Sequence, residues 1–213
     1  DVAAEFINGR PNDNIGITLF AGETFTQCPL TVDHAVLLDM IHNIKCGLIT
    51  DGTAVGMGIA NAVTRLKDSK AKSKVIILLT DGTNNKGDIS PMTAAEIAKS
   101  FGIRVYTIGV GTNGMAPYPY PVGNTVQYVS MPVEIDEKTL TEIAGTTDGN
   151  YFRATSNSKL KEVYEEIDKL EKTKLNVKEY SKRDEEYHWF ALAAFLCVLL
   201  EVLLRNSVLK KIP

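Results

Sequence analysis

The stretch KSKVIILLTDGTNNKG, residues 72–87, places five consecutive apolar residues directly before a polar segment that begins with Thr80 and Asp81. A short apolar run that contains β-branched residues and is bounded by turn residues is typical of a strand buried on both faces, as in a parallel sheet. In open α/β sheets, ligands bind just beyond the carboxyl ends of such strands. Asp81 is therefore either a ligand-binding carboxylate at a sheet edge or an ordinary residue that begins an Asx turn or caps a helix.

On both sides of this strand, the sequence alternates between strand and helix patterns. Strands are predicted at residues 14–20, 23–30, 103–110 and 150–154, and helices at residues 32–44, 53–67, 91–102, 136–145 and 158–175. Strands that alternate with helices of this length form βαβ units. The sequence therefore predicts an α/β, Rossmann-like, doubly wound fold with a mostly parallel sheet and helices on both faces.

Composition limits the class of protein. The chain has 213 residues, of which 44% are hydrophobic, so it can bury one sizeable core, and a formal charge of −3 gives no reason to expect nucleic acid. The three cysteines, Cys28, Cys46 and Cys197, match no metal-binding spacing. We expect Cys28 and Cys46 to be two buried thiols, and the alternative is a disulfide between them, which would require a location outside the cytoplasm.

Groups for catalysis or nucleotide binding are sparse. GVGTNG, residues 109–114, has a dinucleotide-binding spacing, but the prolines that follow it cannot open the helix that would hold a pyrophosphate. DGTAVGMG, residues 51–58, opens a predicted helix but lacks the P-loop lysine. His34 and His42 belong to one predicted helix, and His188 borders an apolar stretch. We therefore expect a binding or structural protein and not an enzyme.

That apolar stretch, WFALAAFLCVLLEVLL at residues 189–204, contains a single charged residue, Glu201. Its 16 residues reach about 24 Å as a helix, short of a hydrocarbon core of roughly 30 Å, but continuing to residue 209 makes the stretch long enough. We expect a membrane-spanning helix at residues 188–209, and the alternative is an amphipathic helix buried against a partner.

The flanks of the predicted span suggest its orientation. Lys210 and Lys211 follow it, which places that end in the cytoplasm and the folded domain outside. Residues 176–187 are highly charged, so we expect a juxtamembrane tether, either solvated or a frayed extension of the last helix. The predicted organisation is a domain at residues 1–175, a tether and an anchor.

Four segments of the predicted domain carry a family resemblance: FAGETFTQCPLTVDH, DGTAVGMGIANAVTRLK, VIILLTDGTNNKGDISP and RVYTIGVGT. The loop ending DGTAVG and the strand ending LLTDG resemble the von Willebrand factor A (VWA) domain, and the likeness extends over residues 1–175. With one span at the end, the chain looks most like the bacterial Bat aerotolerance membrane proteins of BatA or BatB type. The resemblance implies an inner-membrane protein whose periplasmic VWA domain binds other proteins, such as subunits of a membrane complex.

The resemblance also implies a metal-ion-dependent adhesion site for Mg²⁺ or Mn²⁺. Thr53 would bind the cation through its hydroxyl, and Asp81 would bind it directly or through a water. Hydroxyl, carboxylate and water oxygens are the ligands that Mg²⁺ prefers. A carboxylate from a partner can fill a remaining coordination position, so that the ion bridges two proteins.

The sequence departs from the family at its principal metal motif. Asp-x-Ser-x-Ser, which ends the family's first central strand, does not occur, and DVAAEFINGR at residues 1–10 resembles the latter half of the following helix. We therefore expect a VWA domain without that strand and its three metal ligands, so that this chain binds Mg²⁺ or Mn²⁺ weakly or not at all. The expected function is a membrane-anchored protein-binding module with an incomplete adhesion site. The alternative is a structural subunit of a membrane complex with a vestigial cation site.

Residues 114–136 follow a predicted strand and have no helical pattern. Residues 124–133 can pair back as part of a hairpin, which would expose Tyr118, Tyr120 and three prolines. Exposed Tyr and Pro suit a partner-binding surface, because they add contact area at a small entropic cost. The alternative is an ordinary insertion.

Overall fold

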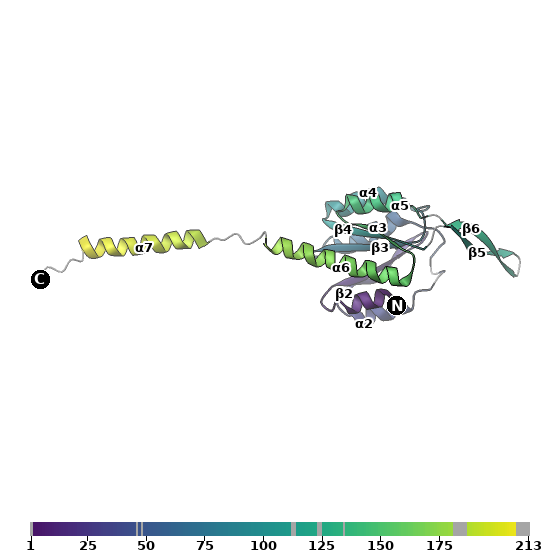
Figure 1. The fold of residues 1–213 in the computed structure, drawn as a ribbon, viewed down its shortest axis with the longest axis horizontal. Coiled ribbons are helices and arrows are strands. Elements are labelled where there is room, and N and C mark those ends of the chain that lie inside the picture. The colour runs from purple at the N-terminus through teal and green to yellow at the C-terminus, as the bar shows by residue number, and fades with distance from the viewer. Residues whose placement is uncertain are drawn as a thin grey trace. The chain divides into compact units, whose positions relative to one another are not determined.

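A computed structural model of the chain describes residues 2–45, 47, 49–111, 114–122, 125–133, 135–180 and 187–207. The chain divides into two units, Asp1–Glu171 and Lys172–Pro213. The elements, labelled in Figure 1, are α1 Val2–Asn8, β1 Ile15–Phe20, β2 Thr24–Thr31, α2 His34–His42, α3 Val55–Leu66, β3 Lys74–Thr80, α4 Pro91–Ser100, β4 Ile103–Val110, β5 Gly114–Val122, β6 Thr125–Val133, α5 Glu137–Thr146, β7 Tyr151–Ala154, α6 Asn157–Tyr180 and α7 Tyr187–Ser207.

The centre of the first unit is a parallel sheet of three strands in the order β3-β4-β7. Its side chains alternate between two faces. Ile76 and Val105 pack with α3, α4 and α5 on one face, and Ile77 and Tyr106 pack with α6 on the other. Figure 1 shows α4 and α5 on one side of these strands and α6 on the opposite side. The predicted α/β fold, with a parallel sheet covered on both faces, is confirmed.

Strands β1 and β2 form a separate antiparallel sheet. Its core of Ile7, Cys28 and Leu37 brings α1 and α2 against these strands. Helix α3 packs against both sheets, and a Cβ atom at Gly58 would lie 2.9 Å from the ring of Phe20. The sequence predicts a mostly parallel sheet that lacks its central strand. No described strand joins β1 to β3, so β1-β2 and β3-β4-β7 are separate sheets, and α3 packs against both.

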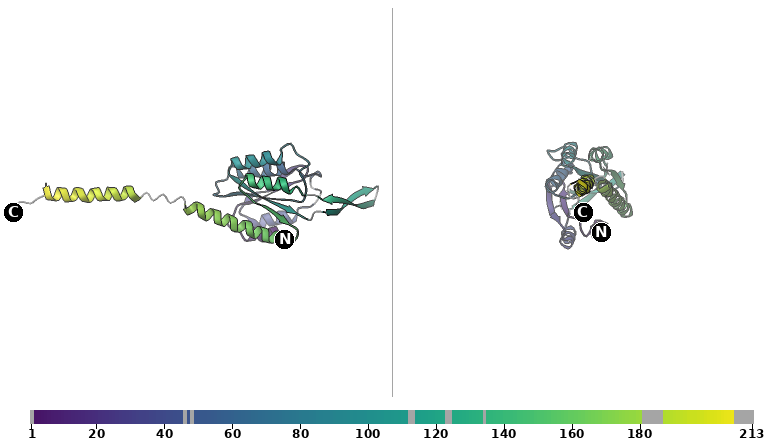
Figure 2. Two further views of the ribbon diagram at one scale, coloured as in Figure 1. Left: turned by 45° about the horizontal axis from the view of Figure 1, so that its top comes forward. Right: turned by 90° about the vertical axis from the view of Figure 1, so that its left-hand side faces the viewer.

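Strands β5 and β6 form an antiparallel hairpin, which confirms the predicted pairing within residues 114–133. Tyr118 lies opposite Val129, and Tyr120 lies opposite Gln127. The side chains of Tyr118 and Tyr120 are outside the part of the chain that the structure describes, so their predicted exposure stays a prediction. Figures 1 and 2 show the hairpin extending away from the other elements of the domain.

The helices near the C-terminus differ in length from their predicted ranges. Helix α6 continues to Tyr180, beyond its predicted end at Leu175, because no Gly or Pro interrupts it. The first part of the predicted tether is thus helical, and residues 181–186 lie outside the described ranges. Helix α7 occupies most of the predicted span, whose last two positions are also not described. Within the described ranges, no helix has both the length and the apolar character needed to cross a membrane.

A candidate cation site at the carboxyl edge of the sheet

Asp81 lies at the carboxyl edge of the parallel sheet. Strand β3 ends at Thr80, which pairs with Gly109 near the end of β4. The buried hydroxyl of Thr80 accepts a hydrogen bond from the N–H of Gly82 at 3.3 Å, which turns the chain at the end of the strand. The side chain of Asp81 is exposed. It caps no described helix, because α4 begins much later at Pro91 and has Ser90 as its N-cap.

Thr53 comes from a different segment, just before α3, and lies beside the segment that carries Asp81. The N–H of Thr53 donates to Oδ1 of Asn85 at 2.9 Å, and its carbonyl accepts from the N–H groups of Asn85 at 3.0 Å and Lys86 at 3.3 Å. A Cβ atom at Gly82 would lie 3.1 Å from Oγ1 of Thr53, so the hydroxyl faces Gly82. These contacts bring the two predicted site residues onto adjacent segments.

The turn between β1 and β2 joins the same group of segments. The N–H of Gly22 donates to the carbonyl of Thr50 at 2.8 Å, and the N–H of Ala54 donates to the carbonyl of Ala21 at 2.6 Å. A Cβ atom at Gly22 would lie 2.8 Å from the carbonyl oxygens of Thr50 and Asp51, so the approach requires glycine. Residues 21–22, 49–54 and 81–86, called the loop cluster below, therefore link the two sheets.

The loop cluster offers oxygen atoms that the described part of the protein does not use. Neither the Thr53 hydroxyl nor the Asp81 carboxylate has a hydrogen bond or an ion pair there, and the buried Oδ1 of Asn84 also lacks a partner. Hard cations such as Mg²⁺ bind oxygens of these kinds. In the part of the chain that the structure describes, however, no three His, Cys, Asp or Glu side chains come together as a metal-binding group. The donor set fits part of a cation site.

Sequence reasoning did not identify the role of Asn85. Its side chain and backbone hold the Thr53 segment against the segment that carries Asp81, although Asn85 and Thr53 are 32 positions apart in the chain. The sequence indicates only that a polar run, Thr83 to Asn85, follows β3. Any of these three residues could have accepted the hydrogen bond from Thr53. Only the folded loops show which one does.

The fold and the loop cluster can be compared with known proteins. A model of the von Willebrand factor type A domain matches residues 1–166. The chain belongs to this family. Among solved structures, this VWA chain is similar to a conserved hypothetical protein BatB from Bacteroides thetaiotaomicron, with 32% identity, a TM-score of 0.69, and coverage of 80% of this chain and 85% of that chain. It is also similar to an aerotolerance-related membrane protein from Bacteroides fragilis, with 28% identity, a TM-score of 0.68, and coverage of 79% and 83%.

A curated relative extends the comparison. The VWA chain is 30% identical over 182 residues to a UPF0353 protein from Nocardia farcinica, covering 77% of this chain and 53% of that protein. Across the curated relatives that it matches, the chain spans between 47% and 61% of their length. The resemblance to the Bat aerotolerance proteins, first seen in the sequence, is confirmed by the two Bacteroides structures.

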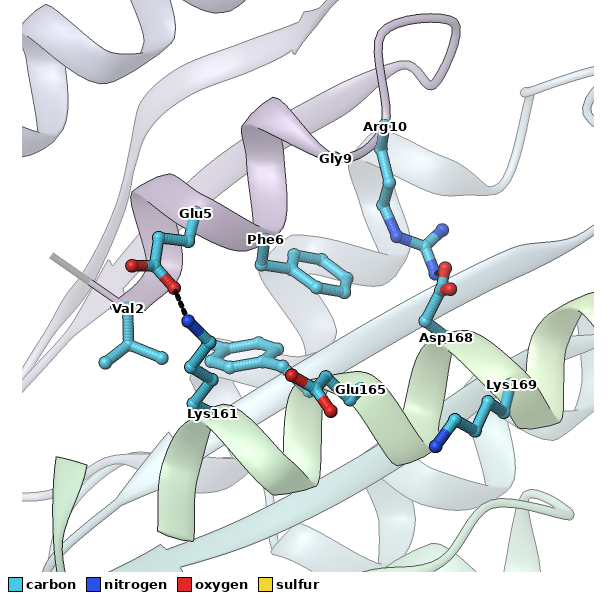
Figure 3. Close-up of a pocket in the computed structure, with 10 residues that line it drawn as sticks. Val2, Glu5, Phe6, Gly9, Arg10, Lys161, Glu165, Asp168 and Lys169 are labelled. Carbon is cyan, nitrogen blue, oxygen red and sulfur yellow. Dashed lines mark hydrogen bonds and ion pairs between the residues drawn. The ribbon is translucent and has the colours of Figure 1, made fainter. Parts of the chain in front are cut away.

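The VWA domain also has a surface hollow of about 380 Å³ between α1 and α6. Figure 3 shows Glu5 and Lys161 facing each other across it, with an ion pair of 2.7 Å. Arg10 pairs with Asp168 at 2.6 Å and lies over the ring of Phe6. None of its lining residues belongs to the loop cluster. These two ion pairs connect the N-terminal segment with α6.

Proposed function

We propose that this VWA domain binds partner proteins, rather than catalysing a reaction, through a divalent cation, Mg²⁺ or Mn²⁺, held at the loop cluster. The observation that supports it is the position of the Thr53 hydroxyl and the Asp81 carboxylate on adjacent segments, where no described side chain bonds to either. When bound, the cation would offer an open coordination position to a carboxylate of the partner.

These two donors, even together with the unpartnered Oδ1 of Asn84, are too few for such a cation, because a dication takes about six oxygens. We propose that a longer form of the protein supplies the others from a strand between β1 and β3. Each of these two strands has one edge that pairs with no described strand. The family's Asp-x-Ser-x-Ser motif belongs at the end of that strand. The greater length of the curated relatives is consistent with this proposal.

We further propose that the C-terminal helix anchors the domain in the bacterial inner membrane, with the VWA domain on the periplasmic side. Large apolar side chains of α7, such as Leu192, Phe195 and Val198, are exposed, which suits an apolar environment. The relative from Bacteroides fragilis is described as a membrane protein. Protease added to intact spheroplasts should digest the domain and spare a C-terminal tag, and a protected domain would reverse the proposed orientation.

Calorimetric titration with Mn²⁺ tests the cation site. This chain should bind weakly, and a longer protein that includes the Asp-x-Ser-x-Ser strand should bind more tightly, with Thr53→Ala and Asp81→Ala both weakening the binding. Asp88→Ala, an exposed carboxylate in the same connection, is the matched control and should leave binding unchanged. Micromolar binding by this chain, lost in Asp81→Ala, would show that its ligand set is already complete.

A second candidate is a structural subunit of a membrane complex with a vestigial cation site. The observation that favours it is that no group of three metal-binding side chains exists among the described residues. The same titration separates the two functions. If the longer protein with an intact strand also fails to bind Mn²⁺ or Mg²⁺, the structural role is the correct one.

A further inference from the structure

The hairpin β5–β6 forms a sheet of its own among the described strands. Its two strands pair with each other and with no other described strand, and Figure 2 shows them extending away from the domain. Neither strand contains a charged residue: the sequence of β5 is GMAPYPYPV and that of β6 is TVQYVSMPV. Two-stranded hairpins are marginally stable in isolation, and natural edge strands usually carry charges that prevent pairing. This hairpin therefore lacks one common protection against adding another strand.

Its four prolines show which backbone groups face outward. In an antiparallel pair, alternate residues direct their N–H and C=O groups toward the partner strand or away from it. All four prolines belong to the same one of these two sets. On β5 they are Pro117, Pro119 and Pro121, and on β6 the fourth is Pro132, which lies opposite Met115. If the backbone groups of this set pointed toward the partner strand, β5 would supply almost no N–H donors to the β5–β6 pairing. The backbone groups of the proline positions must therefore point away from the partner strand.

The two outer edges of the hairpin consequently differ. The outward positions of β5 are Met115 and three prolines, so this edge has almost no N–H donors. The outward positions of β6 are Val126, Tyr128, Ser130 and Pro132, so this edge presents three successive N–H groups with their carbonyls. No other described strand pairs with this edge, and Tyr128 at its middle is 72% exposed. One edge can accept a strand and the other cannot.

We propose that β6 of one chain pairs antiparallel with β6 of a second copy, centred on Tyr128, to give a four-stranded sheet. In this register Tyr128 lies opposite Tyr128 of the other copy, and Val126 lies opposite Ser130. The two tyrosines form a cross-strand aromatic pair, an arrangement that stabilises sheets.

The proline distribution is what favours a second copy as the occupant. A sheet with two open edges can add strands on both sides and grow into a fibre, whereas a twofold contact closes on itself. After β6 pairs with β6, the two outer strands of the new sheet are both β5, which the prolines block. The hairpin can therefore form a dimer through β6, but the dimer cannot add further strands. Self-association that ends at two copies requires this property.

The contact is small compared with interfaces of about 1,200–2,000 Å², so a covalent trap is the suitable test. Cysteine is introduced at position 128 or 127 of the whole chain, in detergent micelles, with Cys46→Ser and Cys197→Ser as background. In the proposed register position 128 faces itself, whereas position 127 faces position 129. Tyr128→Cys should form disulfide dimers at least about tenfold faster than Gln127→Cys, since only the first pair is held in contact. A mixture of Gln127→Cys and Val129→Cys chains should cross-link as mixed dimers.

Backbone variants provide the second test. Tyr128→Pro removes the central outward N–H and should abolish dimers in sedimentation, while Tyr128→Ala keeps that N–H and should retain part of the association. Replacing Pro117, Pro119 and Pro121 together with alanine opens the β5 edge and should yield species larger than dimers. The proposal is overturned if residues 127 and 128 cross-link equally, if Tyr128→Pro dimerises like the parent, or if the parent stays monomeric and β6 pairs with a segment of another protein.

Discussion

The two ends of the parallel sheet each have a carboxylate nearby, and their surroundings are opposite. At the carboxyl end, Asp81 is exposed, and no described group bonds to it. Near the amino end, Glu171 is only 5% exposed and accepts hydrogen bonds from Tyr106 at 2.6 Å and Ser73 at 2.8 Å, and it also pairs with Arg104. A carboxylate whose bonds are made by its own protein stabilises the fold, whereas one that is left without them is available to a ligand.

Glu171→Ala should have the largest effect on stability. The substitution leaves the Arg104 guanidinium and the Tyr106 hydroxyl without their carboxylate partner, and breaking such a buried pair costs about 3 kcal/mol or more. Urea unfolding of the whole chain measures the loss. Glu162→Ala on the same helix, which removes an exposed ion pair with Lys159, is the control and should change the free energy of unfolding by less than about 0.5 kcal/mol. Equal losses in the two variants would contradict the contrast between buried and exposed carboxylates.

Gly56→Ala should have the next largest effect, at the opposite end of the sheet. A Cβ atom there would lie 2.1 Å from the carbonyl oxygen of Ile89, so the start of α3 would move away and the loop cluster with it. Overpacking of this kind lowers the free energy of unfolding by about 1–3 kcal/mol. In Gly145→Ala the new Cβ meets no atom within 4 Å, so this control should be neutral or slightly stabilising. A neutral Gly56→Ala would show that the loop cluster tolerates displacement.

The stability of the protein should depend on pH through Glu171, near the amino end of the sheet. Burial raises the pKa of Glu171, but the hydrogen bonds from Tyr106, Arg104 and Ser73 outweigh it, and the pKa is lowered overall. The stabilisation is therefore complete above the unfolded-state pKa of about 4.3 and is lost as the pH falls through the lower folded-state value. Unfolding measured from pH 6 to pH 3 should show a smaller acid-induced loss in Glu171→Gln than in the parent. Parallel curves would remove Glu171 as the cause.

Asp81→Ala should have the smallest effect on the fold. The carboxylate makes no described contact, so the free energy of unfolding should stay within about 0.5 kcal/mol of the parent. Its effect should appear only with added Mn²⁺, as a loss of any metal-induced rise in melting temperature. A large loss of stability in metal-free buffer would show that Asp81 is a structural carboxylate, like Glu171.

Local patterns were enough to locate the secondary structure. The predicted strand at residues 103–110 has the observed bounds of β4, and the other predicted elements up to β7 end within three residues of those found. Caps explain several helix starts, since Asp33, Ser90 and Asp136 each accept a hydrogen bond from a backbone N–H three residues later. The hairpin was also expected, because residues 114–136 have no helical pattern and residues 124–133 can pair back on the preceding strand.

The sequence by itself determined the α/β fold and the order of its elements, because hydrophobic period, caps and turns are encoded by neighbouring residues. It pointed to Thr53 and Asp81 as candidate ligands only through the family resemblance of their segments. Only the tertiary structure decided which distant groups meet. It placed Asn85 against Thr53 and brought Glu171 to Arg104, 67 positions away in the chain. Such pairs depend on how the elements pack and on how their loops close, which no local pattern specifies.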